Sequence, residues 1–242
     1  MHPKLILVSG GSRGLGGRFV SHLLEAGHAV ATFARKPTPL MAELAGRHPD
    51  RLEFLACDAS DLATLGGFVN RLADRFGGVH GLINNAAVGQ DHLLVHTAPA
   101  IIQNIIATNL TAPILLTRLV LKQMLLQDAG GRIVNISSIC GLRGYTGLTV
   151  YSATKAALDA FTRSLAHEVS GRRVMVNSIA PGFFESEMSS VLSADQLATI
   201  RRRTPTNQLT TDQHLLPVLD MLLFADTNMT GQTVVVDGGI IS

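Results

Sequence analysis

Two side chains of this sequence stand one helical turn apart and are suited to proton transfer. Tyr151 and Lys155 lie four residues apart at the start of a long helical pattern, so they share one face of that helix. A phenol with a pKa of about 10 exchanges protons poorly at neutral pH, and a neighbouring ammonium stabilises its phenolate. Lowering this pKa to about 7 takes roughly 4 kcal/mol, at about 1.4 kcal/mol per unit. The pair therefore predicts a general acid and base.

Ser138 is a second candidate because of its place in the chain. It follows the apolar run 132–137, and ligands of open parallel sheets bind outside the carboxyl ends of the strands. Its hydroxyl can hydrogen-bond a substrate carbonyl. Taken singly, both features have ordinary explanations, because tyrosine and lysine four apart are frequent on helix surfaces and serines often end strands.

A glycine-rich turn follows the first apolar run. The run Leu5–Ser9 leads into Gly10, Gly14 and Gly16, where a helical pattern begins. Glycines that join a strand to a helix let backbone N–H groups approach a pyrophosphate at the positive end of the helix. The spacing is G-x-x-x-G-x-G, for which a tight connection without a ligand is the alternative interpretation. Its position in the first βαβ unit favours dinucleotide binding.

The end of the second apolar run distinguishes the two nicotinamide dinucleotides. NAD enzymes place an acidic residue there on the ribose 2′-hydroxyl, whereas this sequence continues from Ala34 into Arg35 and Lys36. Arg13 in the glycine turn would face the same pocket and add a charge-assisted contact to a 2′-phosphate. An isolated Arg-Lys pair more often solvates a strand end. Together with Arg13 and the missing acidic residue, however, the pair Arg35 and Lys36 predicts that the cofactor is NADP(H).

Short apolar runs alternate with longer helical patterns along the whole chain. Runs without polar alternation suit strands covered on both faces, and their alternation with helices predicts a parallel sheet with right-handed crossovers. We therefore expect an α/β fold, a single doubly wound Rossmann-type domain over residues 1–242 with about seven strands flanked by helices. The expected strands are Leu5–Ser9, Ala29–Ala34, Leu52–Cys57, Gly81–Asn84, Arg132–Ser137, Val174–Ala180 and Thr233–Asp237.

Two further segments position the glycine turn and the substrate. The apolar residues Phe19, Val20, Leu23 and Leu24 recur at helical spacing after the turn, and Gly27 is placed to end that helix. The segment 186–212 is polar and rich in serine, threonine and arginine. It predicts a mobile substrate lid between two core strands.

Composition limits the partners and the location. Of the 242 residues 46% are hydrophobic and 16% charged, against about 25% charged on average, so we expect some apolar surface to be buried between subunits. The formal net charge of +2 argues against nucleic acid. The N-terminal apolar run is too short for a membrane span or signal peptide. Cys57 and Cys140, the two cysteines, fit a reducing cytosol, so we expect a cytoplasmic protein that binds no membrane.

Two other possible reactive groups have ordinary interpretations. His92 and His96 are four apart but lack a third ligand at suitable spacing, so no metal is expected. Cys140 lies two residues after Ser138 and has no apparent activating partner in the sequence, so a buried structural role is expected.

Further motifs follow one another in a fixed order along the chain. They are Ser9-Gly10-x-x-x-Gly14-x-Gly16, Asp58 after the third strand, Asn84-Asn85-Ala86-Ala87, Asn109, Ser138 thirteen residues before Tyr151, Pro181-Gly182, Thr230-Gly231-Gln232 and Asp237-Gly238-Gly239. In this order they resemble the short-chain dehydrogenase/reductase family over nearly the whole chain. The sequence departs from the family pattern at Ser9 and Ser186, where threonine is usual, and at Ala87, where glycine is usual.

The resemblance implies a mechanism and a cofactor site. Ser138 would polarise a ketone carbonyl, Tyr151 would protonate its oxygen as hydride leaves the nicotinamide, and Lys155 would hold the ribose and tune Tyr151. Asn109 would hold a water in a proton relay to Lys155. The implied cofactor-binding residues are Ser9, Gly10, Ser12, Arg13, Gly14, Leu15, Gly16, Arg35, Asp58, Ala59, Asn85, Ala86, Tyr151, Lys155, Pro181, Gly182, Phe184 and Ser186. The C-terminal motifs imply a homotetramer.

Within the family, the chain resembles most the 3-oxoacyl-[acyl-carrier-protein] reductases and the polyketide-type ketoreductases. The resemblance lies in residues 88–94 and 181–188 and in the compact length. It implies NADPH-dependent reduction of a 3-oxoacyl thioester on an acyl carrier protein. Arg172 matches a docking arginine for the acidic carrier near the active-site mouth. A second basic residue is missing at Ala129, for which Arg201–Arg203 on the expected lid would compensate.

Two other functions stay open at this point. One is a reductase or dehydrogenase of a free small ketone or alcohol, such as a sugar, polyol, steroid or cyclic ketone. The other is a catalytically silent NADP-binding protein with a regulatory role. The presence of Ser138, Tyr151, Lys155 and Asn109 together argues against the silent protein, because a binding module has no evident need for all four.

Overall fold

The computed structural model describes residues 3–59, 61–89, 91–184 and 193–241. At its centre is a seven-stranded sheet in which all neighbouring strands run parallel, in the order β3-β2-β1-β4-β5-β6-β7. The strands are β1 (Leu5–Ser9), β2 (Ala29–Ala34), β3 (Leu52–Ala56), β4 (Gly81–Asn84), β5 (Gly131–Ile136), β6 (Val174–Pro181) and β7 (Thr233–Val236). The predicted fold class is thereby confirmed, and the predicted strand boundaries differ from these by at most one residue.

The strands form because their side chains are buried on both faces of the sheet. In β1, Leu5 and Leu7 belong to the apolar cluster of one face, and Ile6 and Val8 belong to the cluster of the other. Successive side chains of a strand point to opposite faces of the sheet, so a run without polar residues places apolar groups on both faces. This suits a sheet that is covered by helices on both sides.

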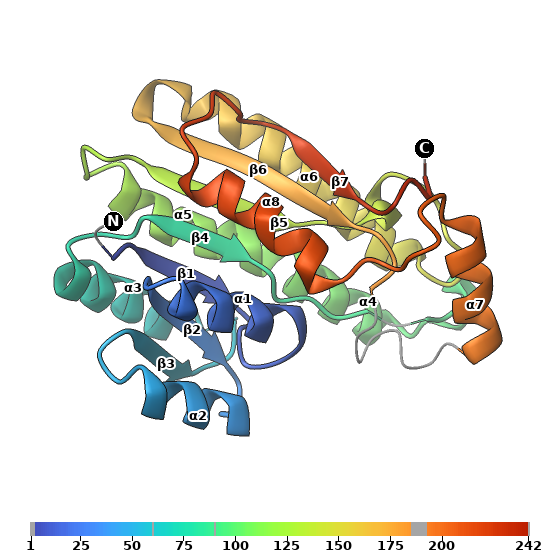
Figure 1. Cartoon of the computed structure of the whole chain (residues 1–242), viewed down its shortest axis with the longest axis horizontal. Coiled ribbons are helices and arrows are strands. Elements are labelled where there is room, and N and C mark those ends of the chain that lie inside the picture. The colour runs from blue at the N-terminus through green and yellow to red at the C-terminus, as the bar shows by residue number, and fades with distance from the viewer. Residues whose placement is uncertain (1–2, 60, 90, 185–192, 242) are drawn as a thin grey trace.

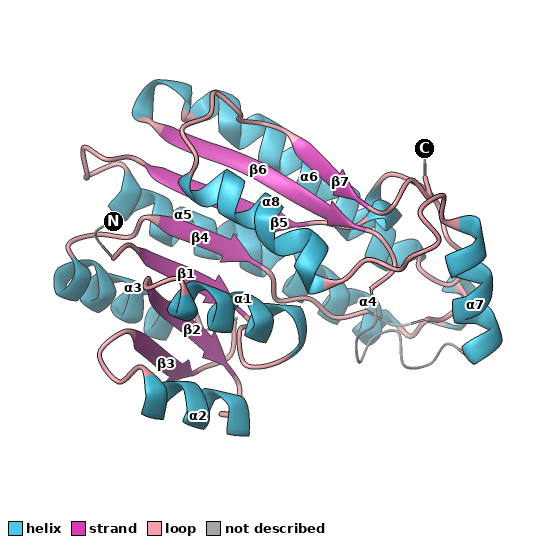
Figure 2. Cartoon of the chain, in the orientation of Figure 1, coloured by secondary structure: helices cyan, strands magenta, loops and turns pink. Residues whose placement is uncertain are grey.

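Helices cover the two faces in two sets (Figures 1 and 2). One face is covered by α1 (Gly14–Glu25), α2 (Pro39–Arg47) and α8 (Asp212–Phe224), and the other by α3 (Leu62–Phe76), α5 (Ala112–Met124) and α6 (Thr149–Glu168). The helices α4 (Pro99–Ile106) and α7 (Ala194–Arg203) lie toward the carboxyl edge of the sheet. Short helical turns occur at η1 (Leu94–His96), η2 (Ala107–Thr111), η3 (Ile139–Gly141) and η4 (Ser170–Arg172).

The first helix begins and ends as its sequence predicts. Its buried residues include Phe19, Val20, Leu23 and Leu24, and the chain leaves the helix through Gly27, which has φ +91°. A backbone in the left-handed region favours glycine, so this residue terminates α1 just before β2.

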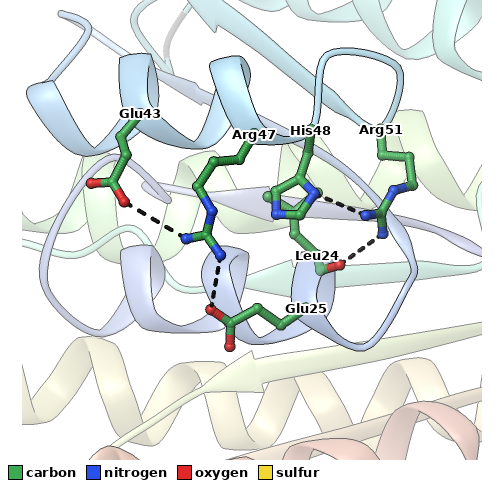
Figure 3. A network of polar contacts seen from close by, with 6 residues as sticks. All are labelled: Leu24, Glu25, Glu43, Arg47, His48 and Arg51. Atoms are coloured by element: carbon green, nitrogen blue, oxygen red, sulfur yellow. Dashed lines mark hydrogen bonds and ion pairs between the residues drawn. The ribbon is translucent and has the colours of Figure 1, made fainter.

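A polar network fixes the ends of α1 and α2 against each other (Figure 3). Arg51 donates one hydrogen bond to the carbonyl oxygen of Leu24 at 2.7 Å and contacts His48 Nδ1 at 2.8 Å. Arg47 forms ion pairs with Glu43 at 3.6 Å and Glu25 at 3.9 Å. The Leu24 carbonyl lies in the last turn of α1, where carbonyl groups need partners from outside the helix, so Arg51 fixes this end of the helix.

The stretch Pro99–Met124 is long and apolar enough to cross a membrane by length and composition. It comprises α4, η2 and α5, and one side of it packs into the fold through buried residues that include Ile105, Leu116 and Val120. It is a core helix of the domain.

The expected lid lies partly within the described residues. Its described part, 193–212, contains α7, which begins with a capping box between Ser193 and Gln196. Residues 186–192 of the prediction lie outside the described residues. The mobility of the segment stays a prediction.

Candidate active site

The predicted site residues meet at one edge of the sheet. Because the strands are parallel, β1, β4, β5 and β6 all end at the same edge, at Ser9, Asn84, Ile136 and Pro181. The strand order reverses between β1 and β4, and such a switch point is where open α/β sheets bind their ligands.

The glycine turn is locked against the end of β4. Ser9 Oγ accepts hydrogen bonds from the backbone N–H groups of Asn85 and Ala86, both at 3.0 Å. The amide of Asn85 donates to the carbonyl oxygens of Ser9 and Gly10. A Cβ at Gly16 would lie 2.3 Å from the Gly10 carbonyl oxygen. Close packing therefore requires the glycine at position 16, and Ser9 and Asn85 act by shaping the turn.

The turn opens the positive end of α1 to an anion. Gly14, the first residue of α1, has φ +54°, and no acidic residue occupies the first turn of the helix. The hydroxyl of Thr38 donates a hydrogen bond to the carbonyl oxygen of Ser12 at 2.7 Å. This bond joins the turn to the start of α2. Thr38 was not among the predicted residues. Its signal is the pair Thr38-Pro39, since threonine before proline is typical of a helix start.

A cavity of about 920 Å³ lies beside this turn. Its lining includes Ser12 and Arg13 of the turn, Thr38 at the start of α2, Phe184 after β6 and Arg201 of α7. Arg35 is exposed just after the end of β2. The glycine cradle, the helix N-terminus and the cavity fit a dinucleotide phosphate. Arg13 lines the cavity and Arg35 does not, and binding of a 2′-phosphate by these two cations stays a prediction.

Three further residues predicted to bind the cofactor, Asp58, Ala59 and Ala86, follow the ends of β3 and β4. Ala59 and Ala86 border the same small hollow, together with Ser9 and Phe33. Asp58 is exposed just after β3. The ends of β3 and β4 lie at the same edge of the sheet, separated by β2 and β1, and cofactor binding by Asp58, Ala59 and Ala86 stays a prediction.

The segment after β6 packs against Thr210 and Asp237 at the carboxyl edge of the sheet. Pro181 is the last residue of β6, and a Cβ on Gly182 would lie 2.7 Å from Thr210 Oγ1 and from the Asp237 backbone. Phe184 forms a parallel β-bridge with Thr210. Thr210, absent from the prediction, thus holds this segment. Ser186 lies outside the described residues.

Three of the four predicted catalytic side chains, those of Ser138, Tyr151 and Lys155, converge between β5 and α6. The ammonium of Lys155 lies 5.5 Å from the centre of the Tyr151 ring and donates a hydrogen bond to the carbonyl oxygen of Ile136 at 2.6 Å. Ser138 Oγ accepts a hydrogen bond from the Cys140 backbone N–H at 3.1 Å, so its hydroxyl hydrogen is available to another group. Cys140 itself is buried, and burial raises the pKa of its thiol.

Burial sets the protonation states of Tyr151 and Lys155. It raises the pKa of Tyr151 well above the ordinary phenol value, and the Cys140 thiol acts in the same direction, while hydrogen bonding to Ser138 lowers it. Burial lowers the pKa of Lys155 to about 8, against opposing effects of Asp159 and Cys140. The lowered tyrosine pKa expected from sequence is therefore not found in the chain alone, because desolvation of the phenolate dominates. At neutral pH the site holds a phenol and an ammonium, the states required to protonate a carbonyl oxygen.

Asn109 lies in the π-helical turn η2, between α4 and α5. Its side-chain amide donates to the Val88 carbonyl oxygen at 2.8 Å and accepts from the Val88 N–H at 2.8 Å, with a longer contact to Thr154 at 3.3 Å. The side-chain amide of Asn109 is already hydrogen-bonded to the backbone of Val88. A proton relay from Asn109 to Lys155 would therefore have to use backbone groups of η2. The relay stays a prediction.

Arg172 lies at the opposite edge of the sheet. It belongs to η4, between the end of α6 and the start of β6. Turns that lead from a helix into a parallel strand lie at the amino edge, away from Ser138 and Tyr151. Within one chain Arg172 therefore does not border the edge that carries Ser138 and Tyr151, and carrier docking at Arg172 stays a prediction. Arg201 does lie at the carboxyl edge, in the lining of the cavity.

The doubly wound sheet, the glycine cradle at its switch point and the Ser138, Tyr151 and Lys155 cluster define a nicotinamide-dependent oxidoreductase. The family model for short chain dehydrogenases matches residues 4–197. The chain belongs to the short-chain dehydrogenase family.

Similar proteins include carrier-protein reductases and sugar-acid dehydrogenases. The chain is 33% identical to the 3-oxoacyl-[acyl-carrier-protein] reductase FabG of Vibrio harveyi, over 99% of this chain and 98% of that protein. It is 32% identical to the human 3-oxoacyl-[acyl-carrier-protein] reductase, over 98% of each chain. A solved gluconate 5-dehydrogenase from Burkholderia cenocepacia, in complex with NADP and tartrate, superposes with a TM-score of 0.91 at 26% identity, over 99% of this chain and 96% of that chain. ElxO with bound NADP superposes with a TM-score of 0.89 at 26% identity, over 99% of both chains.

Proposed function

We propose that the protein is an NADPH-dependent reductase of a 3-oxoacyl thioester carried by an acyl carrier protein, as in fatty acid or polyketide synthesis. The observation that carries the reaction type is the neutral Tyr151 phenol beside the charged Lys155, next to Ser138. The carrier-protein reductases that match the whole chain support the substrate class.

The residues act in a short sequence. Ser138 donates a hydrogen bond to the ketone oxygen, and Tyr151 transfers its proton to the same oxygen as negative charge develops there. The charge of Lys155 stabilises the phenolate that remains. Bound NADPH supplies the hydride to the carbonyl carbon. Arg13 and Arg35 would hold its 2′-phosphate, and the N–H groups at the start of α1 its pyrophosphate.

An apolar segment beside the site supports an acyl substrate. Leu93, Leu94 and Val95 are 53%, 51% and 83% exposed. The preceding His92 donates its backbone N–H to the Gly147 carbonyl oxygen at 3.1 Å, which ties this segment to the loop that leads into Tyr151. Contiguous exposed apolar side chains of this kind mark binding surfaces, and they suit an acyl chain better than a polyol.

Carrier docking has two candidate surfaces. One is the run Arg201–Arg203 on α7, of which Arg201 lines the cavity beside the glycine turn, and its positive charge would suit the acidic carrier. Arg172, at the amino edge, would serve the active site of a second subunit. We infer a homotetramer, which the exposed apolar side chains Ile106, Leu126 and Val235 support.

A free small ketone or alcohol is the second candidate substrate. The likeness to a gluconate 5-dehydrogenase bound to NADP and tartrate favours it. A silent NADP-binding protein is the least favoured alternative, because the acid-base cluster is fully assembled.

Oxidation of NADPH, with NADH in parallel, tests these alternatives. The substrates are a 3-oxoacyl group on acyl carrier protein, the same group on a small thioester, and a panel of free ketones that includes oxidised sugar acids. A preference for the carrier-bound thioester with NADPH is the expected result. Activity on free ketones alone would overturn the carrier proposal in favour of the second candidate.

A further inference from the structure

Helix α6 carries a buried acidic residue that the mechanism above does not use. Asp159 stands one helical turn after Lys155, so the two share a face of the helix. Each side chain is buried, and each residue is only 2% exposed. A buried carboxylate is costly unless it is hydrogen-bonded and balanced by a positive charge.

The hydrogen bonds of Asp159 come from the two strands beneath the helix. Ser137 Oγ, just after β5, donates to Oδ2 at 2.8 Å, and Thr233 Oγ1 of β7 donates to Oδ1 at 3.1 Å. Both donors are hydroxyls, so neither neutralises the carboxylate. The Ser137 and Thr233 hydroxyls fix the orientation of the Asp159 carboxylate, because each carboxylate oxygen is hydrogen-bonded from a different strand.

Lys155 is the cation that this carboxylate affects. Its ammonium is anchored on the Ile136 carbonyl oxygen, and burial disfavours its charge, whereas Asp159 favours it. The other groups that face the pair are the Cys140 thiol of η3, which also favours the ammonium, and the Tyr151 ring. The negative charge of Asp159 therefore stabilises the ammonium of Lys155 and offsets part of the effect of burial.

We propose that Asp159 is a positioning residue that keeps Lys155 protonated beside Tyr151 and thereby sets the upper pH limit of carbonyl reduction. The part that concerns reduction rests on the proposed function. Reduction needs the ammonium to stabilise the tyrosine phenolate, so the rate falls once Lys155 loses its proton. A role confined to joining α6 to β5 and β7 is the competing interpretation.

The ionisation of Lys155 can be measured without any substrate. The lysines of this chain are Lys4, Lys36, Lys122 and Lys155, so NMR of lysine labelled with carbon-13 at Cε resolves them, and Lys155→Met assigns the signal. Asp159→Asn removes the charge and keeps the shape. One of the Ser137 and Thr233 hydroxyls can still donate to its amide oxygen, and the other can turn to accept from its NH2 group. Thr233→Val is the matched control, because it removes a hydrogen bond and keeps the charge.

In Asp159→Asn we expect the pKa of Lys155 to fall by about one unit or more, a tenfold or greater loss of proton affinity. In Thr233→Val we expect the wild-type value. Asp159→Ser is a second neutral variant. It is expected to lower the pKa of Lys155 as Asp159→Asn does, and it replaces Asp159→Asn in the experiment if that variant does not fold. Equal titration of Lys155 in the wild type and the neutral variants would overturn the proposal, as would an equally large shift in Thr233→Val.

The pH profile of kcat/KM gives the functional readout. With any carbonyl compound that the enzyme reduces, the alkaline limb of Asp159→Asn should move to lower pH by the shift that the NMR titration measures, and that of Thr233→Val should stay in place. An unmoved alkaline limb despite a shifted Lys155 would overturn the link to reduction. Failure to reduce a 3-oxoacyl thioester would refute only the proposed substrate, because the NMR titration does not depend on it.

Discussion

The ammonium of Lys155 lies 5.5 Å from the centre of the Tyr151 ring. Two different elements produce this arrangement. Helix α6 carries both residues on one face, and the Ile136 carbonyl oxygen at the end of β5 holds the ammonium at 2.6 Å. The strand thus fixes the charge beneath the phenol, and five experiments follow from this site and the elements that hold it.

Tyr151→Phe removes the proton donor and keeps the ring. We expect carbonyl reduction to fall by about 10² to 10⁴-fold, the usual contribution of a general acid, while NADPH binding measured by fluorescence stays within about twofold. Tyr145→Phe, which alters the only other tyrosine, is the control and should keep its activity. Undiminished reduction by Tyr151→Phe would remove Tyr151 from the mechanism.

Gly16→Ala tests the glycine turn. A Cβ there would lie 2.3 Å from the Gly10 carbonyl oxygen and 2.4 Å from the Asn85 amide nitrogen, so the turn must open. We expect the Kd for NADPH to rise about tenfold or more, equivalent to about 1.4 kcal/mol. Gly46→Ala in α2, where a Cβ meets nothing within 4 Å, should bind NADPH normally and gain about 0.5–1 kcal/mol of stability. Normal binding by Gly16→Ala would contradict this account of the turn.

Arg35→Ala tests the choice of cofactor. Loss of a charge-assisted hydrogen bond to the 2′-phosphate costs about 1.5–3 kcal/mol, so we expect KM for NADPH to rise roughly 10- to 100-fold and KM for NADH to stay unchanged. Lys122→Ala, on the exposed end of α5, is the control. A parallel rise for both cofactors would mean that Arg35 does not recognise the 2′-phosphate.

Arg172→Glu and Arg201→Glu separate the two docking surfaces. If α7 receives the carrier, Arg201→Glu raises KM for a carrier-bound thioester several-fold and leaves the turnover of a small thioester unchanged. An effect confined to Arg172→Glu, and only in the oligomer, would place docking on a neighbouring subunit. Equal loss on both thioesters in both variants would exclude these arginines as docking residues.

His80 predicts acid sensitivity of the fold. It stacks near Phe224, with ring centroids 6.0 Å apart, and contacts the Leu223 carbonyl oxygen at 2.9 Å. Burial lowers its pKa from 6.5 to about 4. The unfolded chain therefore binds this proton first, so stability is unaffected above about pH 6.5 and declines as the pH falls toward 4.

Urea denaturation between pH 7 and pH 4 measures this decline. We expect His80 to account for roughly 1 to 3 kcal/mol of it, less than the full linkage value because the ring is partly exposed. His80→Gln keeps a donor for the Leu223 carbonyl and should flatten the curve, whereas His96→Gln should not. The same slope in the wild type and His80→Gln would show that other groups cause the acid sensitivity.

The sequence by itself determined the strands, the order of the motifs and the types of the reacting groups. Short apolar runs without polar alternation are typical of a strand that is covered on both faces. Gly16 stands where neighbouring atoms leave no room for a side chain, and Gly27 stands where the backbone takes a left-handed conformation. These are local constraints, so they can be seen in a one-dimensional pattern.

Tertiary structure decided how those groups behave. The pKa of Tyr151 depends on desolvation by residues far away in the chain. Burial raises it in the chain alone, an effect that the spacing of Tyr151 and Lys155 does not reveal. Arg172 was expected at the active-site mouth, but the parallel sheet puts helix-to-strand turns at the other edge. Asp159 and Thr233 are 74 residues apart, and their contact beneath Lys155 exists only because β7 packs beside β6. The distance between two side chains, their burial and the edge of the sheet on which they lie are properties of the packed structure. The spacing of residues along the chain does not encode them directly.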